Sequence, residues 1–236
     1  RRGWFRARYL LVLLIPVFMF SGGVIGMYFQ PPALRQFYAL TGLLPIVQAV
    51  IRILGEPLKH ATPRRILERG VGHIPEDRQK HGLVLSFPIH DNLMLCTYYK
   101  PPFARGIDLQ EKVIFENARE LVEQFDVRTP SIYVPASSLS GGNQQKVIVA
   151  RELSRPVCFL VANQPTRGLD VGSIEYIHRE IIEMRDKGMA VLLVSAELDE
   201  ILSLADRIAV MYHGQIVATL EASQATKEEL GLLMAG

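Results

Sequence analysis

The clearest candidate for chemistry is the run of residues 139–146, LSGGNQQK, which precedes the apolar segment VIVAREL. Ser140 can cap a helix that begins at the next residue. Gly141 and Gly142 have no side chains to keep phosphate oxygens away from their backbone N–H groups. Because the N-terminal end of a helix carries partial positive charge, this run predicts a phosphate-binding surface. A capped helix without a ligand is the alternative reading of the same residues.

A second polar motif follows at a distance that excludes coincidence. Residues 158–162, CFLVA, are an apolar run of strand length, and NQPTRGLD follows at residues 163–170. With this motif the chain resembles the ABC ATPase family. LSGGNQQK is similar to the family's signature motif, FLVANQPT to its Walker B strand, and RGLD (Gly168, Leu169 and Asp170 after Arg167) to its D-loop.

Other segments extend the resemblance over residues 55–236. GVGHIPEDR, residues 70–78, looks like the Q-loop region, with Glu76 where the family usually has glutamine. PTRGLDVGSIEYIH, residues 165–178, most resembles the second ATPase half of tandem nucleoside-uptake subunits. The resemblance implies nucleotide contacts at Ser140, Gly141, Gly142, Asn143 and Gln144. It also implies an ATP-binding subunit of an importer for nucleosides or simple sugars.

Besides Glu76, the chain departs from the family at four places. It contains no GxxxxGK[ST] phosphate loop, and QPPALRQ stands in its place at residues 30–36. The resemblance puts the Walker B aspartate at Asn163, the catalytic glutamate at Gln164 and the switch histidine at Ala196. An amide binds Mg²⁺ poorly and cannot accept a proton from water. We therefore expect no ATP hydrolysis by the chain alone.

Family resemblance further implies that a nucleotide site is shared between two ATPase domains. We expect a second ABC ATPase domain to bind most of the ATP and Mg²⁺, while this chain supplies the signature motif. Membrane permease subunits are further expected partners, and a solute-binding protein acts only indirectly. Gly142→Asp is expected to abolish ATP-driven association and to leave the fold intact. A membrane-anchored scaffold without catalysis, or a fusion fragment without a nucleotide role, remains an alternative.

The hydrophobic pattern predicts the elements that position these motifs. Helical spacing covers residues 108–127, 173–187 and 198–205, and strand-length apolar runs cover residues 156–162 and 189–194. Residues 208–211 and 215–220 read as a hairpin that turns at His213 and Gly214. Alternating strands and helices predict an α/β fold with a largely parallel sheet, and the resemblance adds a helical subdomain.

Residues 9–28 contain no charged side chain and follow four arginines. Their length and flanks predict a membrane helix with a cytoplasmic N-terminus, and a buried core helix is the alternative. The predicted division is therefore a membrane or fused segment at residues 1–36 and an ATPase domain, N-terminally truncated or remodelled, at residues 37–236. Residues 37–54 are either a second span or, as turn chemistry favours, a helix followed by a strand at residues 51–54. We expect the cytoplasmic face of the cell membrane as the location.

Composition excludes several other classes of protein. The 236 residues include 26 Lys and Arg against 24 Asp and Glu, so bulk charge indicates no nucleic-acid partner. Cys96 and Cys158 lack metal-type spacing and are expected to be reduced thiols. His90 and His178 read as core or surface histidines. Residues 86–99 resemble the segment that contacts the permease, although a half-buried helix explains them equally well.

Overall fold

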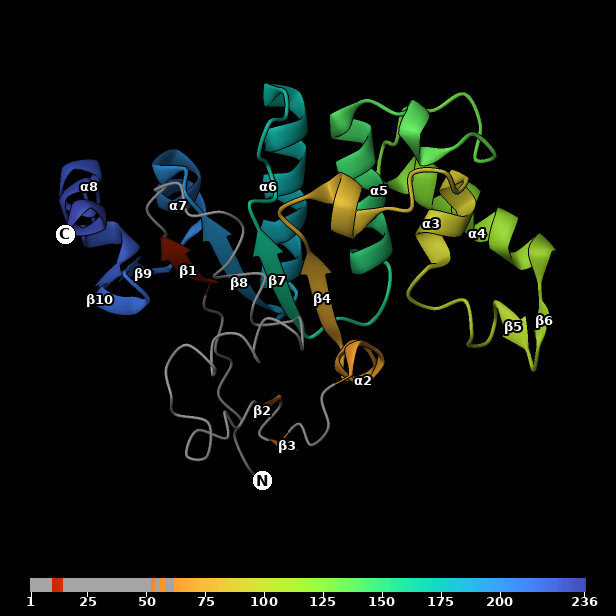
Figure 1. The fold of residues 1–236 in the computed structure, drawn as a ribbon, viewed down its shortest axis with the longest axis horizontal. Coiled ribbons are helices and arrows are strands. Elements are labelled where there is room, and N and C mark those ends of the chain that lie inside the picture. Colours follow the sequence, from red (N-terminus) through yellow and green to blue (C-terminus); the bar gives the residue numbers. More distant parts are fainter. Residues whose placement is uncertain (1–9, 15–51, 54–55, 58–61) are drawn as a thin grey trace.

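The structure is a computed structural model that describes residues 10–14, 52–53, 56–57 and 62–236, with side chains from residue 62 onward. A six-stranded sheet in the order β10-β9-β1-β8-β7-β4 runs through its centre (Figure 1). The strands are β1 (Leu10–Leu14), β4 (Val71–Ile74), β7 (Phe159–Asn163), β8 (Ala190–Ser195), β9 (Arg207–Tyr212) and β10 (Gln215–Glu221). All neighbouring strands pair in parallel except β9 and β10, which confirms the predicted α/β class.

Seven helices accompany the sheet in the described part of the chain. They are α2 (Pro63–Glu68), α3 (Ile89–Met94), α4 (Glu111–Gln124), α5 (Gly141–Leu153), α6 (Val171–Asp186), α7 (Leu198–Leu204) and α8 (Lys227–Ala235). Short turns occur at η2 (Arg78–Gly82, π-helical), η3 (Ala136–Ser138) and η4 (Ala222–Gln224). Two small antiparallel pairs join β2 (Arg52–Ile53) to β3 (Glu56–Pro57), and β5 (Ala104–Arg105) to β6 (Asp108–Leu109). Strand β2 lies within the strand predicted at residues 51–54.

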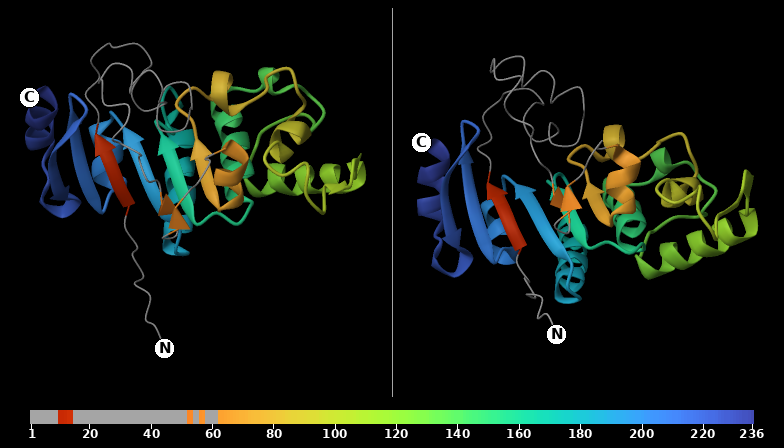
Figure 2. Two further views of the ribbon diagram at one scale, coloured as in Figure 1. Left: turned by 60° about the horizontal axis from the view of Figure 1, so that its bottom comes forward. Right: turned by 90° about the horizontal axis from the view of Figure 1, so that it is seen from below.

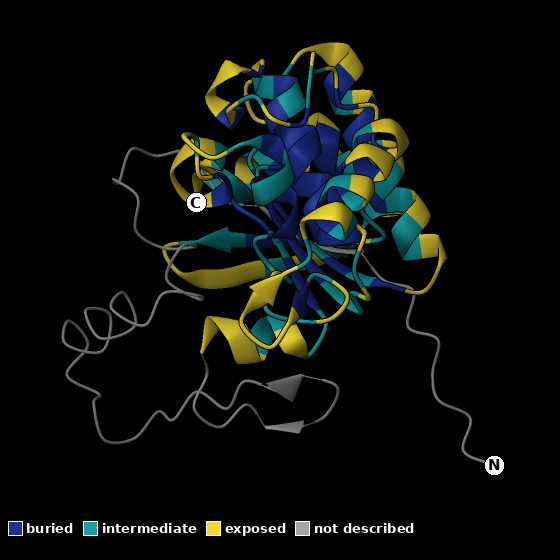
Figure 3. Ribbon diagram, turned by 90° about the vertical axis from the view of Figure 1, so that its right-hand side faces the viewer, coloured by how far each residue is buried: buried dark blue, intermediate teal, exposed yellow. Residues whose placement is uncertain are grey.

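Helix α5 joins the sheet to a smaller helical part. It packs on β4 and α6, and it also contacts α3 and α4. Its residues 147–150 are completely buried, and the dark core in Figure 3 shows this central position. Helix α4 buries Ile114, Ala118 and Leu121 at the predicted helical spacing. The signature motif at the start of α5 is therefore held by the core itself.

The predicted membrane helix is wrong where the structure describes it. Leu10–Leu14 form strand β1, which pairs in parallel with both β8 and β9. A strand with neighbours on both sides and helices over the sheet needs apolar residues on both faces, so its sequence is as free of charge as that of a membrane span. No helix in the described parts of the chain is long and apolar enough to cross a bilayer. Residues 15–51, including the predicted boundary at residue 36 and the QPPALRQ run, lie outside the described residues.

The hairpin prediction is confirmed. Strands β9 and β10 are antiparallel, and His213 and Gly214 have φ angles of 45° and 77° between them. Two successive positive φ angles are those of the tight turn that fits the twist of a hairpin.

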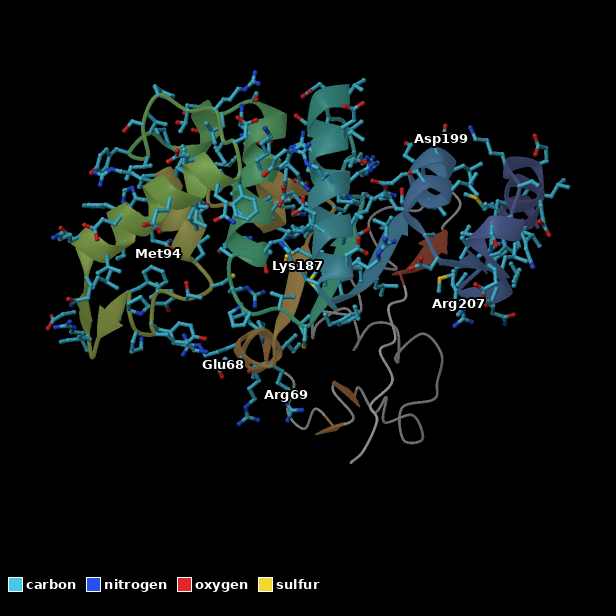
Figure 4. All side chains as sticks on the ribbon, turned by 180° about the vertical axis from the view of Figure 1, so that it is seen from behind. Glu68, Arg69, Met94, Lys187, Asp199 and Arg207 are labelled. Atoms are coloured by element: carbon cyan, nitrogen blue, oxygen red, sulfur yellow. The ribbon has the colours of Figure 1, made fainter. Side chains whose placement is uncertain are left out.

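The carboxyl ends of the parallel strands share one edge of the sheet (Figure 2). The loop after β4 begins at Pro75 and Glu76, the loop after β7 at Gln164, and the loop after β8 at Ala196. In Figure 4, Asp199 on α7 lies at this edge, whereas Glu68 and Arg69 lie at the other. Since loops at the carboxyl edge of a parallel sheet form the usual ligand crevice, the fold places the motifs where a nucleotide site belongs.

Candidate functional site

Ser140 is the N-cap of helix α5, as its sequence predicted. Its backbone is extended, with φ −62° and ψ 158°, and its exposed hydroxyl accepts a hydrogen bond from the backbone N–H of Asn143 at 3.5 Å. The side-chain Nδ2 of Asn143 donates to the same oxygen at 3.0 Å. Oδ1 of Asn143 accepts from the backbone N–H of Arg128 at 2.8 Å. Asn143 therefore fixes the hydroxyl of Ser140 and anchors the preceding loop to α5.

Gln144 points into the protein rather than toward a ligand. Only 2% of its surface is exposed. Its Nε2 donates to the carbonyl of Ala136 at 3.1 Å, and its Oε1 accepts from Nε2 of Gln79 at 3.1 Å. This amide thus joins α5 to two loops, and a nucleotide contact at Gln144 stays a prediction.

The next two residues of α5 hold the helix against its neighbours. Nε2 of Gln145 donates to the carbonyl of Pro165 at 2.8 Å, which attaches α5 to the segment after β7. Nζ of Lys146 lies 2.6 Å from the carboxylate of Asp126 and 4.5 Å from the centroid of the Tyr176 ring. Both side chains are buried. In the run LSGGNQQK, Ser140 is therefore exposed, whereas the last three side chains are buried and hold α5 in place.

Gly142 lies directly against the D-loop. A Cβ atom there would be 2.3 Å from Oγ of Ser173 and 3.1 Å from Oδ2 of Asp170, so a side chain does not fit. Asp170 caps α6 by accepting from the backbone N–H of Ser173 at 3.0 Å and from its hydroxyl at 2.8 Å. These hydrogen bonds, the hydroxyl bond first, lower the pKa of Asp170. The expectation that Gly142→Asp leaves the fold intact stays a prediction, and this close approach to Ser173 and Asp170 argues against it.

The D-loop turns at Gly168, whose φ of 68° suits a residue without a side chain. The backbone N–H of Leu169 donates to the carbonyl of Thr166 at 3.2 Å. Nothing would lie within 4 Å of a Cβ at Gly168, so the tip of the loop faces open space. Gly168 and Asp170 are thus exposed in a turn beside the signature motif, and Leu169 between them is half-buried against the core.

Residues after β4 reach the same loop. The carboxylate of Glu76 forms an ion pair with the guanidinium of Arg167. Nη1 of Arg78 donates to the backbone carbonyl of Arg167 at 3.0 Å. The structure therefore brings the predicted Q-loop and D-loop regions into contact, although 89 residues separate Arg78 from Arg167.

Asn163 and Gln164 stand at the carboxyl end of β7. Asn163 is 7% exposed, and Gln164 has a φ of 48°, which is uncommon for a residue with a side chain. The backbone N–H of Gln164 donates to the carbonyl of Val194 at 2.7 Å, which holds it beside the end of β8, two residues before Ala196. The three positions predicted to have lost their catalytic side chains thus lie at or just after the carboxyl ends of the neighbouring strands β7 and β8.

The donors at this edge suit Mg²⁺ poorly. Asn163 and Gln164 offer amide oxygens, and the carboxylate of Glu76 is already paired with Arg167. No group of three or more His, Cys, Asp or Glu residues that could hold a metal ion occurs in the part of the chain that the structure describes. Since Mg²⁺ is normally held by carboxylates and phosphates, the side chains at this edge do not fit the ion.

A buried polar cluster below the D-loop escaped the sequence interpretation. Oε1 of Glu200 on α7 accepts from Oγ1 of Thr166 at 2.6 Å and lies 3.0 Å from Nε2 of His178 on α6. Burial raises the pKa of Glu200. Hydrogen bonds from His178, Ser195 and Thr166 together outweigh this effect and bring the pKa below its ordinary value, so the charged carboxylate is favoured. His178 is thus a core histidine with a structural partner. In the sequence, this cluster was indicated only by an acidic residue, Glu200, four positions after Ala196.

A second buried cluster stabilises the other end of α5. Glu152 is 3% exposed and accepts from Nε of Arg151 at 3.0 Å and from Nη2 of Arg155 at 2.5 Å. Sγ of Cys96 lies 3.5 Å from the same carboxylate. Burial, followed by the charge of Glu152, raises the pKa of Cys96 to about 11, so its thiol is protonated and unreactive. Cys158 is also free, as predicted.

This fold recurs in known nucleotide-binding proteins. A dimeric ATP-binding cassette solved in a post-hydrolysis state with ADP and phosphate superposes with a TM-score of 0.65 at 18% identity, covering 91% of this chain and 86% of that one. At this identity the likeness shows the fold alone.

Sequence comparison identifies the family. Residues 36–167 match the ABC transporter family, and the chain belongs to it. The guanosine import ATP-binding protein NupO of Bacillus subtilis is 52% identical over 198 residues, which are 84% of this chain and 39% of NupO. The nucleoside import ATP-binding protein NupA of Lactococcus lactis subsp. cremoris is 51% identical over the same shares. The chain therefore spans 39% of the length of these curated relatives, and its motifs had indicated the correct family.

Proposed function

We propose that this chain forms part of the second nucleotide-binding half of an ABC importer for nucleosides or, less closely matched, simple sugars. Its role is to present the signature motif to ATP and Mg²⁺ that are held mainly by another ABC ATPase domain. The names of NupO and NupA, together with identities above 50%, support the nucleoside class. Such an assembly would work at the cytoplasmic face of the cell membrane with permease subunits.

The observation that carries this proposal is the geometry at the start of α5. The exposed hydroxyl of Ser140 stands at the N-terminus of a 13-residue helix. The backbone N–H of Asn143 is capped by Ser140, whereas those of Gly141 and Gly142 have no acceptor within the helix and can face an anion. Gly141 adds no side chain in front of them. A phosphate brought by a partner domain would meet a hydroxyl, free donors and the positive end of the helix dipole.

Contact with a permease is supported by the surface around α3. This helix buries Ile89, Asn92, Leu93 and Met94 against the core. The aromatic rings just outside it remain accessible, with Phe87 46% and Tyr98 42% exposed. Packing of a half-buried helix explains the buried residues of α3, and a protein partner would explain the exposed rings of Phe87 and Tyr98.

The experiment that tests the proposal measures ATP-dependent association with a second ATPase domain that has an intact phosphate loop. Ser140→Ala should weaken association about tenfold or more, because a hydrogen bond to a charged group is worth roughly 1.5–3 kcal/mol. Asn163→Ala serves as the control, since the neutral amide of Asn163 binds Mg²⁺ poorly and its loss should not weaken association. Urea unfolding of both variants corrects for the lost helix cap.

Two results would contradict the proposal. If Asn163→Ala is as damaging as Ser140→Ala, the chain's own edge binds the nucleotide. If neither substitution changes association, the scaffold alternative without a nucleotide role explains the chain better.

A further inference from the structure

The guanidinium of Arg78 lies between the signature motif and the D-loop. Its Nη1 donates to the carbonyl of Arg167 at 3.0 Å. Its Nη2 would be 2.8 Å from a Cβ placed on Gly141, so it packs directly on the backbone at the start of α5. One side chain therefore touches both the D-loop and the signature motif, which the proposed function presents to a partner domain.

The neighbours of Arg78 reinforce this bridge. Glu76 forms an ion pair with the side chain of Arg167, and Nε2 of Gln79 donates to Gln144 in α5 at 3.1 Å. Asp77 caps the turn η2 by accepting from the backbone N–H groups of Gln79 and Lys80 at 3.1 and 3.0 Å. The segment after β4, which passes beside α5 and α6 in Figure 1, is thus itself held in shape.

The tip of the D-loop is packed on the core only through the half-buried side chain of Leu169, so a further contact that holds its backbone matters. Arg167, Gly168 and Asp170 are exposed, and the space beside Gly168 is open. Thr166 is held by Glu200 at one end and Asp170 by its bonds to Ser173 at the other. Between these ends, Arg78 holds the backbone of the loop through the carbonyl of Arg167.

We propose that Arg78 is a positioning residue that fixes the D-loop against the signature motif, so that both face a partner ATPase domain as one surface. A planar guanidinium donates in two directions at once, whereas the ammonium of lysine is a single point on a flexible stem. The contact is a property of this chain. Its consequence for ATP rests on the proposed function.

Amide hydrogen exchange of the full chain tests the contact without a partner. Arg78→Lys and Arg78→Gln should each speed exchange at residues 167–169 about tenfold, the factor that one net hydrogen bond represents. Exchange at α4 should stay unchanged. Arg105→Gln, an exposed arginine on β5, is the matched control and should leave the D-loop as it is. Wild-type exchange rates at residues 167–169 in Arg78→Lys would overturn the proposal. If Arg78→Gln alone were faster, a positive charge would be enough to hold the D-loop, and if neither variant were faster, Arg78 would not hold it at all.

Kinetics of the assembled importer test the consequence. Arg78→Lys should lower kcat for ATP about tenfold and leave KM nearly unchanged, since it disturbs geometry and keeps the charge. A raised KM with an unchanged kcat would overturn the positioning role and indicate direct binding of phosphate. Ser140→Ala separates the two hypotheses: if it leaves ATP-dependent association intact, the proposed function fails, while the exchange experiment still decides the role of Arg78.

Discussion

A Cβ atom on Gly142 would lie 2.3 Å from Oγ of Ser173, so the signature helix and the cap of α6 meet without room for a methyl group. Gly142 is buried, and Ser173 is bonded to Asp170 through both its hydroxyl and its backbone N–H. The second glycine of the motif is therefore required by packing within the chain, independently of any phosphate. A substitution there cannot report on nucleotide contact alone.

Gly142→Ala is expected to destabilise the chain by about 1–3 kcal/mol, because overpacking forces the start of α5 away from α6. The measurement is the free energy of urea unfolding. Gly172→Ala is the matched control: its Cβ would lie 3.5 Å from Oδ1 of Asp170, an ordinary contact, in the first turn of α6. Since alanine favours a helix over glycine, this variant should gain up to about 1 kcal/mol. Equal effects of the two substitutions would show that the close approach at Gly142 does not exist.

Glu200→Gln is expected to cost about 1–3 kcal/mol of stability at neutral pH by weakening the bonds to Thr166 and His178. The pKa of Glu200 is lowered in the folded chain, so its contribution is fully present above the ordinary value of 4.5 and is lost as the pH falls below it. Unfolding free energies of the two proteins should therefore converge under acidic conditions. Glu197→Gln, an exposed neighbour, should follow wild type at every pH. A difference that persists undiminished under acidic conditions would exclude the charged carboxylate as its cause.

Val12→Pro tests the placement of β1. Val12 pairs with Leu193 of β8 and Ile208 of β9, so proline would interrupt a strand that has neighbours on both sides. We expect a loss of about 1–3 kcal/mol for each backbone group left without a partner, measured by urea unfolding. Val217→Pro is the control, since Val217 lies at a register shift in the outer strand β10 and is 45% exposed. If residues 9–28 formed a membrane helix instead, Val12→Pro would not change the unfolding of the domain.

Purified chain alone is expected to show no Mg²⁺-dependent ATP turnover above a blank. The reason is chemical: the amides of Asn163 and Gln164 neither hold Mg²⁺ firmly nor accept a proton from water. Phosphate release is the measurement, with the same preparation in EDTA as the blank. Turnover that disappears in Gln164→Ala would contradict this prediction and assign catalysis to the end of β7.

Local patterns in the sequence determined much of the fold and the place of the site. Helical spacing in α4 and α6, the apolar runs of β7 and β8, and the turn at His213 and Gly214 are properties of neighbouring residues, so they could be predicted without the tertiary structure. The motif around Ser140 likewise indicated a capped helix and the correct family. These features depend on interactions within a few residues along the chain.

Partners across the fold were decided only by the tertiary structure. An apolar run without charge suits a membrane helix and a doubly paired strand equally, and only the pairing with β8 and β9 identifies Leu10–Leu14 as β1. Hydrophobic spacing reports that a residue is buried, but not which distant residue it meets. The bonds from Arg78 to Arg167 and from Thr166 to Glu200 therefore had no local signal. The sequence explained Gly142 by the access of phosphate to the backbone. The structure adds a second reason, because α6 approaches Gly142 too closely for a side chain.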